Sequence, residues 1–319
     1  MAVARFTKGV AVFAGLAFAG AAACNDVVSA DTDGGGADGV DGSVPDARGS
    51  VPSLDGSAND AAIDVTPDGS TKGPLAFVFA GESNSGGIAR NSDATVAELA
   101  ARPSVRIMNL YSGTFAFEPL DIGFNNIVDH AGLSDNPTYV PHSPNDIVVH
   151  GMELGLANAV EAGAFAGVTS VYLIKTGQGG SQIAQWAAGG PFWAKFLERT
   201  NAAKATLPSN TRWVVWYSQG INDSNAGVST ATWKVDTTAH LQKIKAQLPG
   251  CQIILTEFQS MPGGAGYPAY NAAIRELVAA DPALASIPSD NAGNDGAYHW
   301  SYAGYRNVVV PALVAKTKQ

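Results

Sequence analysis

Short apolar runs alternate with longer amphipathic stretches from residue 74 to the end of the chain. Five runs are rich in Val, Ile, Leu and aromatic residues, as buried strands are. These runs are 74–80, 105–110, 169–175, 212–218 and 251–257. The stretches that we expect to be helical are 93–101, 152–163, 182–204, 231–247, 267–280 and 302–317. The alternation predicts an α/β fold with three α/β/α layers and a doubly wound, mainly parallel, five-stranded sheet.

One long interruption breaks this alternation. The segment from 111 to 150 has little regular pattern. In a doubly wound sheet, ligands bind at the carboxyl ends of the strands, near the point where the strand order reverses. We expect the irregular segment to be an excursion that shapes a pocket at this edge.

The pattern before residue 74 is different. Residues 1–24 place Arg5 and Lys8 ahead of an apolar stretch and end in Ala-Ala-Ala-Cys, which is typical of an export signal. The small residues before Cys24 resemble the lipidation box of bacterial lipoproteins, although Ala21 stands where Leu is usual. The alternative is an ordinary cleavage site. We therefore expect an exported protein, anchored by lipid at a periplasmic or cell-surface membrane or else secreted.

Residues 25–73 are predicted to be a disordered linker. They consist mostly of Asp, Gly, Ser, Ala, Pro and Val and include no aromatic residue. Such a segment cannot bury enough apolar surface to fold. A flexible tether of this length spans about 35–40 Å. The expected domains are thus the signal at 1–24, the linker at 25–73 and one folded domain at 74–319.

Charge and cysteine content exclude several functions. The net charge is −9, but ten Asp residues of the linker account for most of it. The sequence contains no Lys/Arg cluster or basic stripe, so we expect no nucleic-acid partner. Cys24 and Cys251 are the two cysteines, and because Cys24 belongs to the export signal we expect no internal disulfide. Cys251 begins a predicted strand and is interpreted as a small buried residue.

Four polar blocks follow predicted strands or precede the last helix. The first is Gly-Glu-Ser-Asn-Ser-Gly-Gly at 81–87. A strand that breaks into such a turn lifts a Ser hydroxyl to the sheet edge, where backbone N–H groups can face an oxyanion. The second is Gly-Gln-Gly-Gly-Ser-Gln-Ile at 177–183, whose glycines allow a ligand to approach a backbone N–H. Taken singly, either block is equally a structural turn.

The other two blocks carry side chains suited to catalysis. Gln-Gly-Ile-Asn-Asp at 219–223 offers a side-chain amide as an oxyanion donor, or else a helix cap. Asp-Gly-Ala-Tyr-His at 295–299 offers a carboxylate and a general base, or else a surface loop. The spacing of His130, His142 and His150 matches no metal motif, so we expect no metal and no cofactor.

Together the four blocks resemble the SGNH hydrolase superfamily, and more closely its sialate O-acetylesterase/acetylxylan esterase branch of carbohydrate esterases. That branch carries Gly-Gln-Ser-Asn-Met-x-Gly, Gly-Gly-Thr-Ser-Ile-x-x-Trp, Gln-Gly-Glu-x-Asp and Asp-Gly-x-His. The resemblance covers about 74–317 and implies the flavodoxin-like SGNH fold. The chain departs from it where Glu82 replaces Gln, Ser85 replaces Met, and an extra residue separates Asp295 from His299. Its third block is closer to the superfamily's Gly-x-Asn-Asp.

The resemblance implies a serine esterase that removes O-acetyl groups from sialate- or xylan-like glycans through an acyl-enzyme. In that interpretation Ser83 is the nucleophile, His299 the general base and Asp295 the acid that orients the imidazole. The implied oxyanion hole consists of the N–H groups of Ser83 and Gly179 and the side-chain amide of Asn222.

Some assignments stay open at this stage. The extra residue before His299 leaves Asp290 or a backbone carbonyl as alternatives to Asp295. Candidate substrate-binding residues are Glu82, Gln219, Gly180, Trp186 and Trp300. The two tryptophans are either sugar-stacking platforms or helix-packing residues.

Two other functions also fit the sequence. One is a broader SGNH lipase or thioesterase. The other is a surface-tethered glycan-binding protein with a decayed site, which the Glu82 replacement and the stretched Asp–His spacing favour. The sequence indicates neither the particular glycan nor the oligomeric state.

Overall fold

The computed structural model describes residues 72–109, 115–122, 125, 149–259, 267–293 and 298–317, which all belong to the unit Asn59–Gln319. The expected export signal and nearly all of the expected linker lie outside the described residues. Within the part that is described, none of the helices combines the length and the apolar character needed to cross a bilayer.

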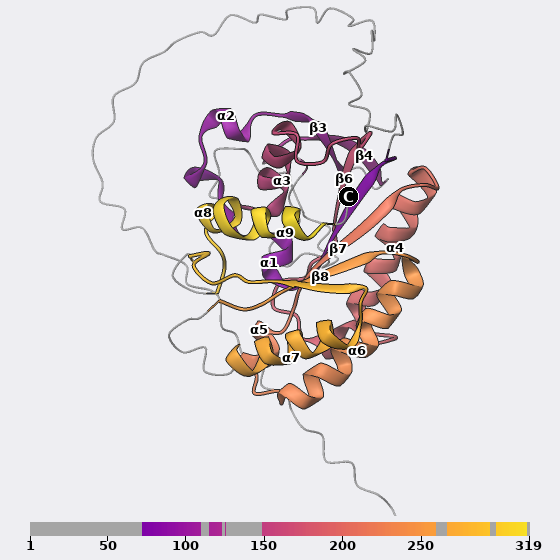
Figure 1. Cartoon of the computed structure of the whole chain (residues 1–319), viewed down its shortest axis with the longest axis vertical. Helices are drawn as coiled ribbons and strands as arrows, with labels where there is room; N and C mark the ends of the chain where they lie inside the picture. Colours follow the sequence, from indigo (N-terminus) through magenta and orange to yellow (C-terminus); the bar gives the residue numbers. More distant parts are fainter. Residues whose placement is uncertain are drawn as a thin grey trace, which may run out of the picture. The chain divides into compact units, whose positions relative to one another are not determined.

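A seven-stranded sheet in the order β4-β3-β6-β1-β7-β8-β9 is the centre of the fold (Figure 1). Its strands are β1 Leu75–Gly81, β3 Arg102–Asn109, β4 Ala116–Leu120, β6 Val171–Lys175, β7 Arg212–Ser218, β8 Gln252–Thr256 and β9 Leu284–Ile287. All neighbours are parallel except β3 and β4. A separate antiparallel pair consists of β2 Ala89–Arg90 and β5 Val149–His150. The predicted mainly parallel α/β class is confirmed, but the predicted count of five strands is wrong.

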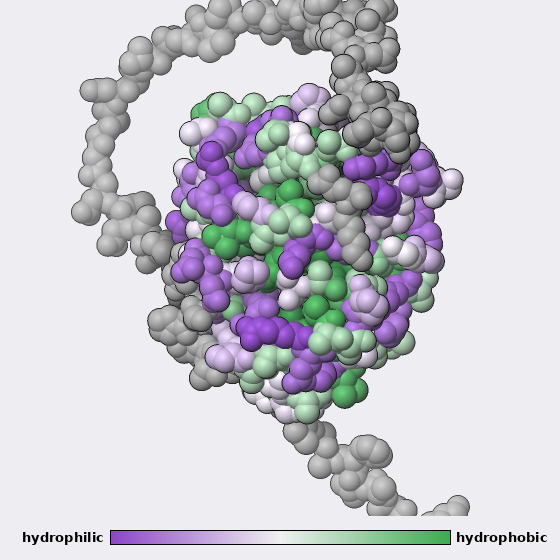
Figure 2. Space-filling view, in the orientation of Figure 1, coloured by the Kyte–Doolittle hydropathy of each residue, from purple (hydrophilic) through white to green (hydrophobic). Residues whose placement is uncertain are grey.

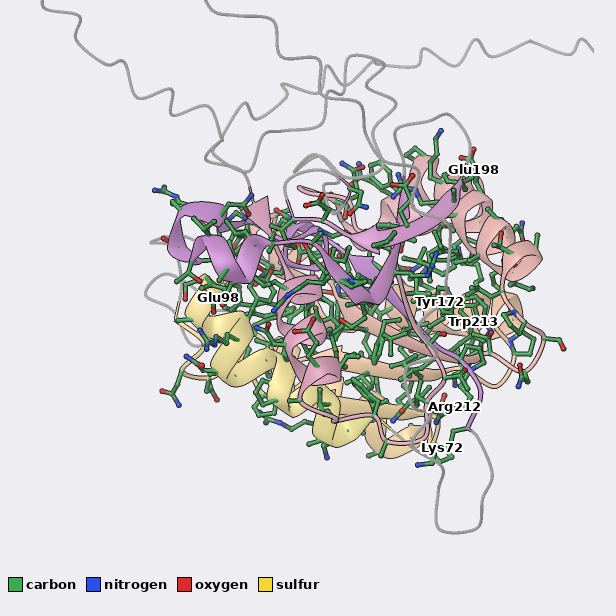
Figure 3. All side chains as sticks on the ribbon, turned by 90° about the horizontal axis from the view of Figure 1, so that it is seen from above. Lys72, Glu98, Tyr172, Glu198, Arg212 and Trp213 are labelled. Carbon is green, nitrogen blue, oxygen red and sulfur yellow. The ribbon has the colours of Figure 1, made fainter. Side chains whose placement is uncertain are left out.

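Helices cover both faces of the sheet. They are α1 Ser83–Gly86, η1 Asn91–Asp93, α2 Val96–Leu99, α3 Met152–Glu161, η2 Ile183–Trp186, α4 Pro191–Thr206, α5 Ile221–Asn225, α6 Thr230–Gln247, α7 Tyr267–Ala280, α8 Tyr302–Gly304, the π-helical turn η3 Tyr305–Val309, and α9 Val310–Lys316. Apolar residues of α4, α6 and α7 share one core cluster, and those of α3, η3 and α9 share the other. In Figure 3, Glu98 of α2 lies beside the C-terminal helices, where it accepts a hydrogen bond from Arg306.

The central strand β1 shows why the sheet is buried on both sides. All seven of its residues are buried. Ala76 and Val78 belong to the cluster on the α6 face, whereas Phe77 and Phe79 belong to the cluster on the α9 face. Alternate side chains of a strand point to opposite faces, so a continuous apolar run is what a strand between two helical layers requires.

Three departures from the predicted elements have local causes. The expected helix 182–204 divides into η2 and α4, because Gly189 and Gly190 interrupt it and Pro191 begins the new helix. Strand β4 belongs to the irregular excursion, and its Pro119 is the kind of residue that edge strands tolerate. Strand β9 has only four residues and lacks a long apolar run.

Register brings three of the polar blocks to one edge of the sheet. Gly81 at the end of β1 is aligned with Ser218 at the end of β7. On the other side, the Gln178 N–H after β6 donates to the Gly81 carbonyl over 2.8 Å. From β1 the chain builds β3, β4 and β6 on one side of it and then crosses to β7, β8 and β9 on the other side, so the strand order reverses at β1. The blocks at 81–87, 177–183 and 219–223 therefore follow three adjacent strands at this reversal.

A buried ion pair fixes the start of α3 to the end of β6. The Lys175 Nζ lies 2.8 Å from the Glu153 Oε1, and the two side chains are 2% and 0% exposed. The same carboxylate oxygen accepts the Gly151 N–H over 2.9 Å. Burial lowers the pKa of Lys175, and the neighbouring Glu153 carboxylate opposes that shift. The pair thus neutralises two charges that could not stay buried singly.

Replacing Lys175 with Met is expected to destabilise the fold by about 3–5 kcal/mol, because it removes the cation that neutralises the buried Glu153 carboxylate. Urea unfolding followed by circular dichroism measures the change. The matched control is Lys234→Met, which removes the exposed pair with Glu276 and is expected to change stability by less than about 1 kcal/mol. Equal effects of the two substitutions would contradict the structural role of the buried pair.

Candidate active site

Ser83 begins α1 directly after the central strand. Gly81 has φ +120°, and a Cβ on it would overlap the Ser218 carbonyl oxygen. Only glycine fits this backbone position. The Glu82 N–H donates to the same Ser218 oxygen over 2.8 Å, and the Ser85 hydroxyl donates to the Glu82 carbonyl over 2.6 Å. The turn is therefore fixed on both sides of the Ser83 side chain.

The His299 ring lies against the Ser83 hydroxyl. The Nε2 atom is 3.1 Å from the Ser83 Oγ, although the residues are 216 positions apart in the chain. With the neutral tautomer that carries its proton on Nδ1, Nε2 accepts the hydroxyl hydrogen. A hydroxyl in contact with an imidazole is the arrangement of an activated nucleophile and its base. The two side chains predicted to react together do lie together.

Asn84 holds the chain on both sides of His299. Its buried side-chain Nδ2 donates to the Tyr298 carbonyl, and its Oδ1 accepts the Trp300 N–H, both over 3.2 Å. Its own carbonyl accepts the Tyr305 hydroxyl over 2.8 Å. The residue that follows Ser83 thus positions His299. The sequence pattern predicts no role for Asn84, and its place beside Ser83 is the one signal that points to it.

The Glu82 carboxylate is turned away from solvent and holds the third block. It is fully buried and accepts the N–H groups of Gly220, Ile221 and Asn222 over 2.9, 2.7 and 3.1 Å. It also accepts a hydrogen bond from the Asn222 side-chain amide. Burial raises the pKa of Glu82 to about 7, while the backbone N–H donors lower it and Asp223 adds to the rise. The candidate role of Glu82 in contacting substrate does not fit this arrangement.

A second network ties the second block to the third. The Asp223 carboxylate accepts the Ile183 N–H over 3.1 Å and the Gln219 amide over 3.1 Å. Gln219 also donates to the Ser181 carbonyl over 2.9 Å, and Ser181 accepts the Trp186 indole N–H over 3.1 Å. The loops that carry Gly179 and Asn222 are therefore held to each other. Gln219 and Trp186 serve this network rather than facing solvent.

The two tryptophans proposed as sugar platforms are in the core. Trp186 and Trp300 are 0% and 1% exposed. Trp186 contacts the rings of Phe192 and His240, and Trp300 contacts those of Trp216 and Tyr305. Buried rings present no face to a ligand, so the helix-packing interpretation of these residues is correct. Two neighbours of the site do reach solvent, Gly180 and the 44%-exposed Tyr298 beside His299.

Several predicted residues cannot be placed. Asp295, Cys24, His130 and His142 lie outside the described residues. The alternative acid Asp290 is described and is exposed.

The remaining candidates are interior residues. Cys251 is a free buried cysteine, and burial raises its pKa to about 11, which does not suit a thiolate nucleophile. His150 is buried, with its Nδ1 2.9 Å from the Asn91 Oδ1. Within the described ranges there is no group of three or more His, Cys, Asp or Glu side chains that could hold a metal ion.

Figure 2 shows hydrophilic residues spread over the visible face, with smaller hydrophobic areas between them.

Comparison with known proteins shows to which family this sequence is similar. A family model described as "SASA: Carbohydrate esterase, sialic acid-specific acetylesterase" matches residues 75–309. The solved structure of NanS shares the fold with a TM-score of 0.58 at 14% identity, over 77% of this chain and 97% of that one. A protein from Arabidopsis thaliana gives 0.53 at 15% identity, over 76% and 98%. No curated protein matches the chain in sequence.

Replacing Asn84 with Ala is expected to lower kcat by about 10²-fold, because the loop that presents His299 to Ser83 loses both of its side-chain clamps. Steady-state hydrolysis of an aryl acetate measures it, with near-ultraviolet circular dichroism to verify packing. Asn91→Ala is the matched control, since Asn91 is equally buried but pairs with His150. An Asn84→Ala protein with the parent kcat would show that His299 is positioned by other contacts.

Proposed function

The chain belongs to the carbohydrate esterase family of sialic acid-specific acetylesterases, and on this premise we propose that it is a serine esterase that removes O-acetyl groups from carbohydrate. Membership makes the protein a hydrolase that acts on ester bonds. The observation that carries the serine mechanism is the 3.1 Å contact between the Ser83 Oγ and the His299 Nε2.

The reaction proceeds through an acyl-enzyme. The Ser83 Oγ attacks the acetyl carbonyl carbon while the His299 Nε2 takes the hydroxyl proton. When the tetrahedral intermediate collapses, His299 gives this proton to the departing sugar oxygen. Water then attacks the acetyl-serine carbonyl with His299 again as base. The bond from the acyl carbon to the Ser83 Oγ breaks, His299 returns the proton to that oxygen, and acetate leaves. Asp295 is the proposed partner of the imidazolium, on the strength of the family resemblance. This chemistry uses only protein groups and water.

Three N–H donors form the proposed oxyanion hole. They are the backbone N–H groups of Ser83 and Gly179 and the side-chain amide of Asn222. The amide carries two N–H groups, and one of them is bound by Glu82, which leaves the other for the acyl oxygen. Loss of one such donor lowers turnover by about 10²–10³-fold. The family name supports an acetylated sialate as substrate, and xylan-like glycans are the alternative within the resemblance.

The site is proposed to work at a membrane. The sequence before residue 74 supports export, lipid attachment at Cys24, and a long tether between the lipid and the esterase domain. Such a tether would let the esterase domain reach glycans outside the bilayer, whether periplasmic or at the cell surface. Cleavage without lipid attachment would give a secreted esterase.

Replacing Ser83 with Ala is expected to reduce acetate release from aryl acetates and O-acetylated glycans to background, because it removes the hydroxyl that lies 3.1 Å from the His299 Nε2. The parent protein is expected to lose activity sharply from acetyl to butyryl and octanoyl esters. Ser104→Ala is the control, since that hydroxyl lies on β3 and donates to Glu161.

The outcomes separate three functions. A Ser83→Ala protein that is as active as its parent would contradict the serine mechanism. A parent that prefers octanoyl esters is a lipase or thioesterase of the same fold. A parent that neither releases acetate nor reacts with a fluorophosphonate, but still binds glycans, has a decayed site.

Replacing Cys24 with Ser is expected to move the protein from the membrane fraction to the soluble fraction of a bacterial host, because the thiol that accepts the lipid is lost. Metabolic labelling with an alkyne fatty acid, followed by fractionation and blotting, measures this. Equal membrane association of the parent and the variant, with no label on either, would contradict lipid anchoring and favour secretion.

A further inference from the structure

Helix α5 begins at a residue that cannot cap it. The first N–H groups of a helix have no acceptor within the helix, and the preceding side chain usually supplies one. Here that residue is Gly220, with φ +129°. A Cβ on it would lie 2.7 Å from the Trp233 Nε1. Because no side chain fits at this position, the N–H groups of Gly220, Ile221 and Asn222 need an acceptor from elsewhere.

Glu82 supplies that acceptor from a position 138 residues earlier in the chain. Its Oε1 accepts the Gly220 and Ile221 N–H groups, and its Oε2 accepts the backbone N–H and the side-chain amide of Asn222. A carboxylate offers about four acceptor positions in total. The loop 220–222 therefore occupies all the acceptor positions of the Glu82 carboxylate.

The carboxylate also decides which way the Asn222 amide faces. The four hydrogen bonds at the Glu82 carboxylate are all accepted by it, which is the pattern of an ionised carboxylate. Such a group selects the NH₂ end of the Asn222 amide and repels the Oδ1. One N–H of Asn222 is thereby fixed on Glu82 and the second points elsewhere from the same nitrogen. Asn222 is only partly buried, so this second N–H can meet a ligand.

Glu82 is itself fixed relative to the nucleophile. It is the residue before Ser83, its N–H is bound to the Ser218 carbonyl, and its carbonyl accepts from Ser85. Glu82 alone thus links the position of the Asn222 amide to that of Ser83.

We propose that Glu82 is a positioning residue: its carboxylate orients the Asn222 amide so that one N–H faces the acyl oxygen at Ser83. The inference rests on the proposed function, since it assigns the oxyanion donor of that reaction. This role explains why Glu82 stands where the related esterases have Gln. Glu82 contacts neither substrate nor the reacting atoms and acts only through Asn222.

The test is a double-mutant cycle between Glu82→Gln and Asn222→Ala. Glutamine has the same shape but only one acceptor oxygen. Its NH₂ group either faces N–H donors of the 220–222 loop, which it cannot accept, or pairs with the Asn222 Oδ1 after that amide has rotated by 180°. We expect Glu82→Gln to lower kcat for an aryl acetate at least about tenfold with KM little changed. The double variant is expected to be no slower than Asn222→Ala alone, because the first residue acts through the second. Losses that multiply would overturn the proposal, as would a Glu82→Gln protein with the parent kcat.

Glu153→Gln is the matched control. Glu153 is another fully buried carboxylate, but it binds Lys175 and the Gly151 N–H. Its replacement is expected to lower the unfolding midpoint and to combine independently with Asn222→Ala in kcat. If Glu153→Gln gave the same non-additive pattern as Glu82→Gln, any loss of a buried charge would explain the result, and the positioning role would be rejected.

A second measurement does not depend on activity. Hydrogen exchange of the Gly220, Ile221 and Asn222 amides is expected to quicken in Glu82→Gln and to stay slow in Glu153→Gln. If the parent releases no acetate but this protection is lost in Glu82→Gln, the proposed function fails, and what remains is that Glu82 holds the 220–222 loop. If the parent is active and protection is unchanged in Glu82→Gln, the orienting role fails and the proposed function stands.

Discussion

Backbone N–H groups at the carboxyl edge of β6, β1 and β7 lose their contact with water, and the fold depends on the side chains that accept them. A buried N–H without an acceptor destabilises a protein by roughly the desolvation free energy of the group. Glu82 accepts three such groups, and Asp223 accepts the Ile183 N–H from the neighbouring loop. Because each acceptor comes from another segment, satisfying the backbone also fixes the loops in one arrangement.

This coupling explains how residues far apart in sequence form one site. Ser83 follows the central strand, and the loops on either side belong to strands paired directly with it. His299 lies just before the C-terminal helices, and Asn84 binds the residues before and after it. The block at 81–87 therefore contacts every other block: Glu82 reaches the block at 219–223, Gly81 the block at 177–183, and Asn84 the block at 295–299.

The fold class and the proximity of Ser83 to His299 could be predicted because the strands and the polar blocks leave local signals. Apolar runs mark the central strands, and the blocks after them mark the edge where ligands bind. What could not be predicted depends on tertiary partners. Strand β9 is too short to stand out, and Trp186 and Trp300 resemble surface aromatics until their neighbours are known. Glu82 could be interpreted only as a charge near the nucleophile, since its partners lie 138 to 140 residues away.

Two buried glutamates show how differently this fold treats the same group. Glu153 faces the ammonium of Lys175, so the pair carries no net charge. Glu82 is surrounded instead by N–H dipoles and the nearby carboxylate of Asp223, and burial raises its pKa to about 7. N–H dipoles stabilise a buried charge less than a cation does, so the Glu82 carboxylate destabilises the folded state more than the paired Glu153 carboxylate does. An uncharged residue would avoid that cost but could not exclude the reversed amide of Asn222. The proposed orienting role accounts for this loss of stability, since a functional site can keep a destabilising group where that group fixes the direction of a hydrogen-bond donor.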